Sequence, residues 1–151
     1  MLIFAIANDL LCEMRDTKLK QRKRRDLYSL YKKGLEEGQF TSMREAGAWL
    51  VRQPAPCFYI SPEEACKLIG RILGNRSLID VNSSTRRMVW ELYRRYKDYL
   101  YRNPKTKKSR ISIMNELVEQ PAPEFYMTSD AVRRTLRDEI SEVKIRTGWG
   151  E

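Results

Sequence analysis

The sequence contains two copies of one ten-residue segment, and this repeat constrains the fold more than any other feature. Residues 50–59 read LVRQPAPCFY and residues 117–126 read LVEQPAPEFY, so that eight of the ten positions are identical at an offset of 67 residues. Chance does not supply agreement of this length, and a repeat at a fixed offset indicates that one supersecondary unit occurs twice. We therefore expect a tandem duplication within the 151 residues.

Helix start signals flank both copies of the repeat. The run SMRE at residues 42–45 has the form of a capping box, so a helix should begin near Ser42, and its counterpart should begin near Ser109 or Ser112. Both helices should stop at the glutamine before the first proline, because proline disfavours helix in its predecessor. After the copies, SPEE at residues 61–64 and TSD at residues 128–130 each predict the start of a further helix.

A third element repeats further upstream at a different offset. LYSLYKK at residues 27–33 aligns with VWELYRR at residues 89–95, and the apolar positions of each run share one helical face. Each half therefore reads helix, loop, helix, connector, helix. This order predicts an all-α fold, a tandem duplication of a three-helix module with an extended Pro-Ala-Pro-x-Phe-Tyr connector before the third helix. The expected parts are an apolar N-terminal extension (1–14), module one (15–74), a linker (75–84), module two (85–146) and a C-terminal tail (147–151).

The connector itself has a structural and a functional interpretation. Side chains alternate along an extended segment, so one ring of each Phe-Tyr pair should enter the core while the other stays at the rim. In the structural interpretation the connector is a rigid link with an aromatic anchor. In the functional one, the outer ring contacts a partner or a nucleic-acid backbone.

The composition argues against catalysis and bound metal. The chain has no histidine, and Cys12, Cys57 and Cys66 form no C-x-x-C pair, which removes Ser-His and Cys-His dyads and nearly all mixed His/Cys zinc sites. Cys57 is matched by Glu124 in the second copy, which argues against a nucleophile. No carboxylate motif or phosphate-binding glycine loop is present. We expect no enzymatic activity, no cofactor and no small-molecule substrate, and the unpaired cysteines indicate a reducing, intracellular location.

The first twelve residues, MLIFAIANDLLC, are apolar but do not have the features of a targeting segment. They lack a basic start and a cleavage site, and they are too short to cross a bilayer, so no membrane partner is expected. Two interpretations stay open: an amphipathic segment packed on the core, or an extension upstream of a natural start at Met14.

The charge points to a polyanionic partner. The chain has 29 basic and 20 acidic residues, and residues 15–33 and 86–110 together hold 19 of the basic ones with four acids. A solvated basic surface is the alternative interpretation. The candidate nucleic-acid-binding residues are basic side chains on these two segments and on the helices after the connectors: Arg22, Lys23, Arg24, Arg25, Lys32, Lys33, Lys67, Arg71, Arg87, Arg94, Arg95, Arg102, Lys105, Lys107, Lys108, Arg110, Arg133, Arg134 and Arg137.

Two helices joined by a connector, the second well capped, are loosely similar to a helix-turn-helix, although this connector is longer and holds two prolines. The leading hypothesis is an accessory or regulatory protein that binds double-stranded DNA, with two such modules acting as an intramolecular pseudo-dimer and the second copy as the better groove binder. DNA is favoured over RNA because no RNA-binding sheet motif is present. The alternative is a helical interaction or scaffold module of a larger, possibly phage-type assembly, with an acidic protein partner.

The Pro-Ala-Pro-x-Phe-Tyr signature resembles a feature of small prokaryotic or phage-type proteins, and this resemblance implies such an origin without indicating a mechanism. We accordingly expect a cytoplasmic protein, nucleoid-associated if it binds DNA.

Overall fold

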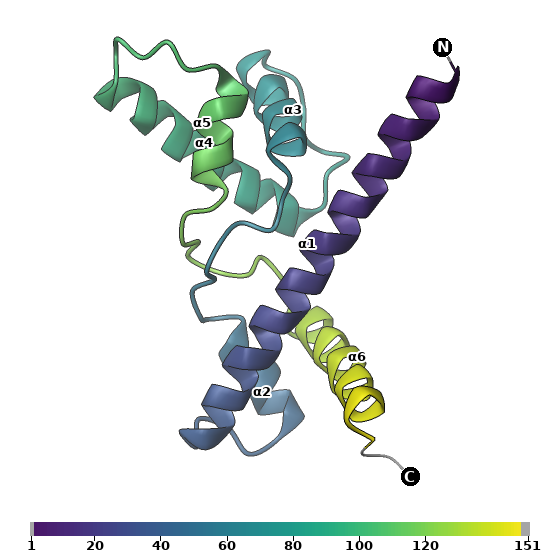
Figure 1. Ribbon diagram of the computed structural model, residues 1–151. Coiled ribbons are helices and arrows are strands. Elements are labelled where there is room, and N and C mark those ends of the chain that lie inside the picture. Colours follow the sequence, from purple (N-terminus) through teal and green to yellow (C-terminus); the bar gives the residue numbers. More distant parts are fainter. Residues whose placement is uncertain (1, 149–151) are drawn as a thin grey trace. The chain divides into compact units, whose positions relative to one another are not determined.

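The chain folds into helices, as expected for an all-α protein. The computed structural model describes the backbone of residues 2–148 and the side chains of residues 17–148, and no strand occurs within that range. The helices are α1 (Leu2–Glu36), α2 (Met43–Leu50), α3 (Pro62–Leu73), α4 (Ser83–Arg102), α5 (Arg110–Leu117) and α6 (Ser129–Thr147) (Figure 1). The segment expected as an N-terminal extension is, from residue 2, the first part of α1. Of the expected tail, residues 149–151 lie outside the described residues.

The predicted N-caps are confirmed. The hydroxyl of Ser42 accepts a hydrogen bond from the amide of Glu45 at 3.2 Å, and Ser61 does the same for the amide of Glu64 at 3.1 Å. Thr128 caps α6 in the same way. Of the two alternatives for α5, Ser109 is the cap. In each case a side-chain oxygen satisfies a backbone donor that the first helical turn leaves unpaired.

Helices α2 and α5 end earlier than predicted, at Leu50 and Leu117 instead of at the glutamine before the proline. The backbone amides of Gln53 and Gln120 donate to the carbonyls of Leu50 and Leu117, so the chain has already tightened into three-residue turns. The Gln53 side chain donates to the carbonyl of Trp49, which also accepts the backbone amide of Arg52 in this turn. Proline thus affects the whole last turn and not only the residue before it.

The six helices form two compact units, and each unit takes helices from both halves of the sequence. Unit 1 is Met1–Pro54 with Met127–Glu151 and holds α1, α2 and α6; unit 2 is Ala55–Tyr126 and holds α3, α4 and α5. Helix α6 packs on α1 and α2, whereas α3 packs on α4 and α5 (Figure 1). The packing therefore follows a different partition from the contiguous modules expected at residues 15–74 and 85–146.

The core of unit 1 is built around a close crossing of α2 and α6. Leu50, Val132 and Leu136 are fully buried there. At Gly47 of α2, an added Cβ would lie 2.8 Å from the Ser129 hydroxyl and 3.1 Å from the Ser129 carbonyl oxygen. Such distances exclude any side chain without movement of α6, so glycine is what lets the two helices approach.

The core of unit 2 consists of apolar side chains from α3, α4 and α5. Ile69, Leu92 and Met114 are fully buried, together with Val89. Met114 aligns with Gly47 at the offset of 67 residues, so the two units fill the same sequence position with very different volumes. The side chains that face this position must therefore leave a different volume in each of the two cores.

The two connectors pair with each other inside unit 2. Ala55 and Ala122 exchange backbone hydrogen bonds of 2.9 Å in both directions, as an isolated antiparallel bridge. Phe58 and Phe125 are each 2 % exposed, while Tyr59 and Tyr126 are partly buried. Tyr59 stacks on Phe125 at 5.8 Å between ring centroids, and Phe58 stacks on Tyr126 at 6.1 Å. Ala55 and Ala122 occupy corresponding positions of the repeat, and each of the two ring contacts is the counterpart of the other, so the bridge has local twofold character.

No helix in the described part of the chain has the length and apolar character needed to span a bilayer.

Candidate nucleic-acid interface

Many of the basic side chains predicted to bind nucleic acid form ion pairs with carboxylates of their own unit. In unit 1, Arg24 of α1 pairs with Glu139 at 3.5 Å and Glu142 at 3.0 Å. In unit 2, Arg87 pairs with Glu124 at 2.5 Å. Further ion pairs formed by predicted residues within the described side chains are Arg71 with Asp80, Arg94 and Arg95 with Glu91, Arg102 with Asp98, Lys108 with Glu116, and Arg133 with Asp130.

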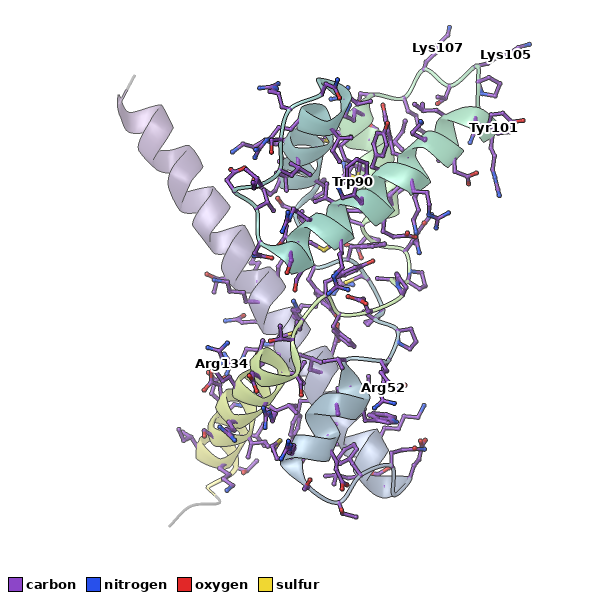
Figure 2. All side chains as sticks on the ribbon, turned by 180° about the vertical axis from the view of Figure 1, so that it is seen from behind. Arg52, Trp90, Tyr101, Lys105, Lys107 and Arg134 are labelled. Atoms are coloured by element: carbon purple, nitrogen blue, oxygen red, sulfur yellow. The ribbon has the colours of Figure 1, made fainter. Side chains whose placement is uncertain are left out.

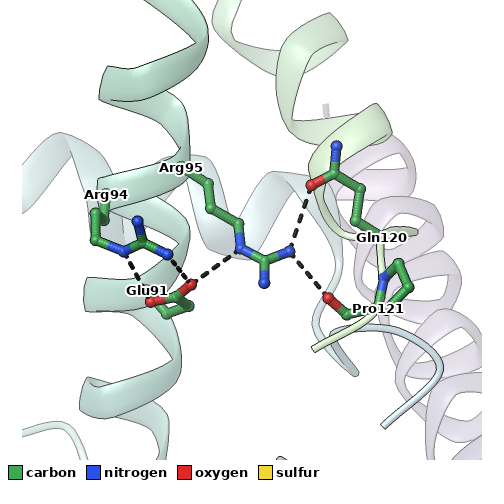
Figure 3. A network of polar contacts seen from close by, with 5 residues as sticks. All are labelled: Glu91, Arg94, Arg95, Gln120 and Pro121. Atoms are coloured by element: carbon green, nitrogen blue, oxygen red, sulfur yellow. Dashed lines mark hydrogen bonds and ion pairs between the residues drawn. The ribbon is translucent and has the colours of Figure 1, made fainter. Parts of the chain in front are cut away.

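Arg95 is the clearest case of a predicted binding residue with a structural contact. It projects from α4 toward the connector, where its guanidinium donates to the carbonyl oxygen of Pro121 at 2.9 Å and to the Gln120 side chain at 3.3 Å (Figure 3). Its Nε donates to Glu91 at 3.0 Å, and the guanidinium carbon lies 4.8 Å from the Phe58 ring centroid. Arg95 therefore ties α4 to both connectors.

The acidic and phenolic groups beside Arg95 have shifted pKa values. The hydrogen bond from Arg94, with a further one from Arg95, holds the pKa of Glu91 below its usual value, against an opposing effect of burial. Burial, reinforced by the nearby carboxylates of Glu91 and Glu124, raises the pKa of Tyr126 to about 12. At neutral pH the Glu91 carboxyl is therefore charged and the Tyr126 hydroxyl is neutral.

Other predicted residues are in contact with aromatic rings or with neighbours. Lys32 lies 5.6 Å from the ring centroid of Tyr28, and Arg110 lies 6.0 Å from that of Tyr96. Arg22 and Lys23 also interact with other groups. The predicted residues that are exposed and form neither an ion pair nor a ring contact within residues 17–148 are Arg25, Lys33, Lys67, Lys105, Lys107, Arg134 and Arg137.

Helix α4 carries an outward-facing aromatic stripe that was not predicted from the sequence. Trp90, Arg94, Lys97 and Tyr101 follow one another at helical spacing, and all four are exposed. With Lys105 and Lys107 of the following loop, these residues are called the α4 surface. In Figure 2 Tyr101, Lys105 and Lys107 project at one end of unit 2, and Trp90 lies nearer the middle of α4. The helical period alone could have revealed the stripe, because Trp90 and Tyr101 fall opposite the buried positions.

Unit 1 has a smaller counterpart of the α4 surface on α1. Tyr28 and Tyr31 stack at 6.4 Å between centroids, with Lys32 over the Tyr28 ring. At the offset of 62 residues, these two rings align with Trp90 and Tyr93, which meet edge to face at 5.6 Å. Both units therefore combine an aromatic pair with a cation on a helix surface.

The expected helix-turn-helix pairs are rearranged. The helices on either side of each connector belong to different units, and the packed pairs are α2 with α6 and α3 with α5. Of the expected groove-binding arginines, Arg134 and Arg137 are exposed on α6, with Arg134 labelled in Figure 2. Arg52, just after α2 and not among the predicted residues, is also exposed in unit 1.

Comparison with known proteins gives no relative: no family model, curated protein or solved structure matches the chain. No group of acidic or cysteine side chains suited to holding a metal ion occurs among the described residues.

Proposed function

We propose that the protein is a small basic accessory or regulatory protein that binds nucleic acid, with double-stranded DNA as the favoured form. The observation that carries the proposal is the set of exposed cations without acidic partners. Lys105 and Lys107 are of this kind in unit 2, and Arg134 and Arg137 are in unit 1. Neighbouring cations such as Lys108 and Arg133 are neutralised by carboxylates, whereas these four residues retain charge that phosphates can compensate.

The two units act, in this proposal, as an intramolecular pseudo-dimer that arose by tandem duplication of a three-helix module. The reciprocal bridge between Ala55 and Ala122 supports it, because residues at the same repeat position contact each other as they do in a twofold dimer. The packed pairs α2 with α6 and α3 with α5 would then be the helix-turn-helix-like elements, each drawn from both copies. We place such a protein in the cytoplasm, associated with the nucleoid.

A salt titration of duplex binding tests the proposal. If the four cations named above each neutralise one phosphate, the affinity should fall about 150-fold between about 50 and 200 mM salt, from a slope of about −0.9 per phosphate. Fluorescence anisotropy of a labelled duplex measures it. Absence of binding at the lower salt contradicts the proposal.

A matched pair of variants in unit 2 separates specific contacts from net charge. Lys105→Ala with Lys107→Ala removes two cations without ion pairs and should flatten the salt slope by about 1.8. Arg102→Ala with Lys108→Ala removes the same charge from the same region, but these side chains pair with Asp98 and Glu116. The second variant should keep the slope close to that of the wild type. Equal slopes for both variants would mean that only overall charge matters.

Exposed apolar side chains favour a second candidate function, a helical interaction or scaffold module with an acidic protein partner. In unit 2, Ile79 is 82 % exposed and Trp90 and Tyr101 also face solvent. Copurification from cells after nuclease treatment separates the two functions. A stoichiometric protein partner that survives the nuclease supports the scaffold, whereas loss of all partners supports nucleic-acid binding.

A further inference from the structure

The α4 surface carries two large rings that the core of unit 2 does not use. Trp90 is 51 % exposed and Tyr101 is 86 % exposed, whereas Val89 and Leu92 on the opposite side of the helix are fully buried. Trp90 meets only the edge of Tyr93 at 5.6 Å, and Tyr101 has no ring contact or hydrogen bond within the described residues. Both rings are therefore available for contact with a partner, and the cations around them indicate which kind of partner that is.

Cations separate and flank these rings. Arg94 lies between them with its side chain 69 % exposed, although it also bonds Glu91 at 2.6 Å. Lys97 lies between them too, 5.4 Å from the ring centroid of Tyr93. Lys105 and Lys107 continue the positive charge beyond Tyr101. Residues 86–110 hold ten basic and two acidic side chains, which favours a partner that is anionic along its length.

The spacing of the rings suits a single strand better than a duplex. Trp90 and Tyr101 are eleven residues apart on one helix, which corresponds to about 16 Å along its axis. In a duplex the base faces are covered by their neighbours, and only edges are accessible in the grooves. Unpaired bases expose their faces, and stacking on aromatic side chains beside a positively charged track is how sequence-tolerant single-strand binders work.

Building on the proposed function, we propose that the α4 surface binds unpaired nucleotides of single-stranded nucleic acid. Bases stack on the rings of Trp90 and Tyr101, while Arg94, Lys97 and the loop lysines contact the phosphates between and beyond them. No sequence preference is expected, because every base offers a face to stack.

Three probes test this with the full-length protein: a labelled oligothymidylate of about 12 nucleotides, an abasic oligomer of equal length and charge, and a blunt duplex. The wild type should bind oligothymidylate at least about fivefold more tightly than the abasic oligomer, the effect of one stacked base. Trp90→Ala with Tyr101→Ala should reduce oligothymidylate binding to the abasic level and leave abasic and duplex binding unchanged. Ile79→Ala, which removes an equally exposed apolar side chain of unit 2 outside the α4 surface, should change none of the three.

The outcomes distinguish this inference from the proposed function. Duplex binding with equal affinity for oligothymidylate and abasic oligomer overturns the stacking site and leaves the proposed function intact. Preference for oligothymidylate without duplex binding supports the stacking site and contradicts the duplex form of the function. Binding of none of the probes overturns both. The wild-type comparison of the two oligomers holds even if the double variant fails to fold. If the wild type shows no preference for oligothymidylate but binds anionic lipid vesicles, and the double variant loses that vesicle binding, the α4 surface is a membrane-binding site and the stacking site is overturned.

Discussion

The same substitution, glycine to alanine, should have opposite effects in the two units. In α2, an added Cβ at Gly47 would lie 3.0 Å from the Arg133 Cγ and 3.1 Å from the Ser129 carbonyl oxygen, so that α6 must move. In α3, an added Cβ at Gly70 would meet only the Arg110 guanidinium, at 3.5 Å, an ordinary contact. Both glycines lie within helices, so their intrinsic helix propensities change by the same amount.

The two effects can be estimated separately. Alanine gains about 1 kcal/mol over glycine inside a helix. At Gly70 nothing opposes this gain, and Gly70→Ala should raise the free energy of unfolding by about 0.5–1 kcal/mol. At Gly47 the overpacking of a tight crossing costs about 1–3 kcal/mol. Gly47→Ala should therefore lower the free energy of unfolding by about 1 kcal/mol.

Urea denaturation of the full-length protein, followed by far-ultraviolet circular dichroism, measures both changes. Hydrogen exchange of the buried residues Leu50 and Ile69 assigns each change to unit 1 or unit 2. The close crossing of α2 and α6 is refuted if Gly47→Ala stabilises the protein as much as Gly70→Ala does.

Three further substitutions probe the polar contacts. Arg95→Ala should speed amide exchange at Ala122 by roughly five- to 150-fold, because hydrogen bonds to a charged group contribute about 1–3 kcal/mol, and unchanged exchange would contradict an anchoring role. Glu139→Gln should lower the free energy of unfolding by about 1–3 kcal/mol in urea titrations, since its carboxylate is 6 % exposed and bridges two arginines; a neutral effect would argue against the bridge. Arg94 lowers the pKa of Glu91, so this group stabilises the fold above its unfolded pKa of about 4.5, and the stabilisation is lost as the pH falls through the lower folded value. Glu91→Gln should therefore weaken the fall in the free energy of unfolding below about pH 4.5, the unfolded pKa, and an unchanged profile would contradict this assignment.

The sequence predicts local features of the fold well and the pairing of its halves poorly. The caps at Ser42, Ser61 and Thr128 involve residues three apart, so they can be predicted from spacing alone. Helices α3 and α6 carry equivalent apolar stripes, so the apolar pattern alone does not indicate which helices each of them packs on. The path of the connectors decides which helices α3 and α6 pack on, and local sequence patterns do not reveal that path.

The sequence predicts which residues of the candidate interface are basic, but it does not predict which of them remain accessible to a partner. Basic segments are visible in the sequence, whereas the neutralisation of Arg87 depends on Glu124, 37 residues away. The contacts of Arg95 with Gln120 and Pro121 likewise join groups 25 and 26 residues apart. Such contacts exist only after folding. They separate the cations that hold the fold together from those that remain accessible to a partner.

The division of the chain between the two units sets an order on synthesis. Unit 2 is complete once residue 126 has emerged from the ribosome, while α1 and α2 must wait for α6, which is synthesised after unit 2. The N-terminal part of the chain is therefore synthesised first and folded last, against the usual N-to-C order of domains. During that interval Leu27 and Leu50 lack the helix that covers them in the finished protein. A nascent chain stalled with residues up to 126 emerged and α6 still inside the ribosome should hold a folded unit 2 and an open unit 1, which limited proteolysis on the ribosome would detect.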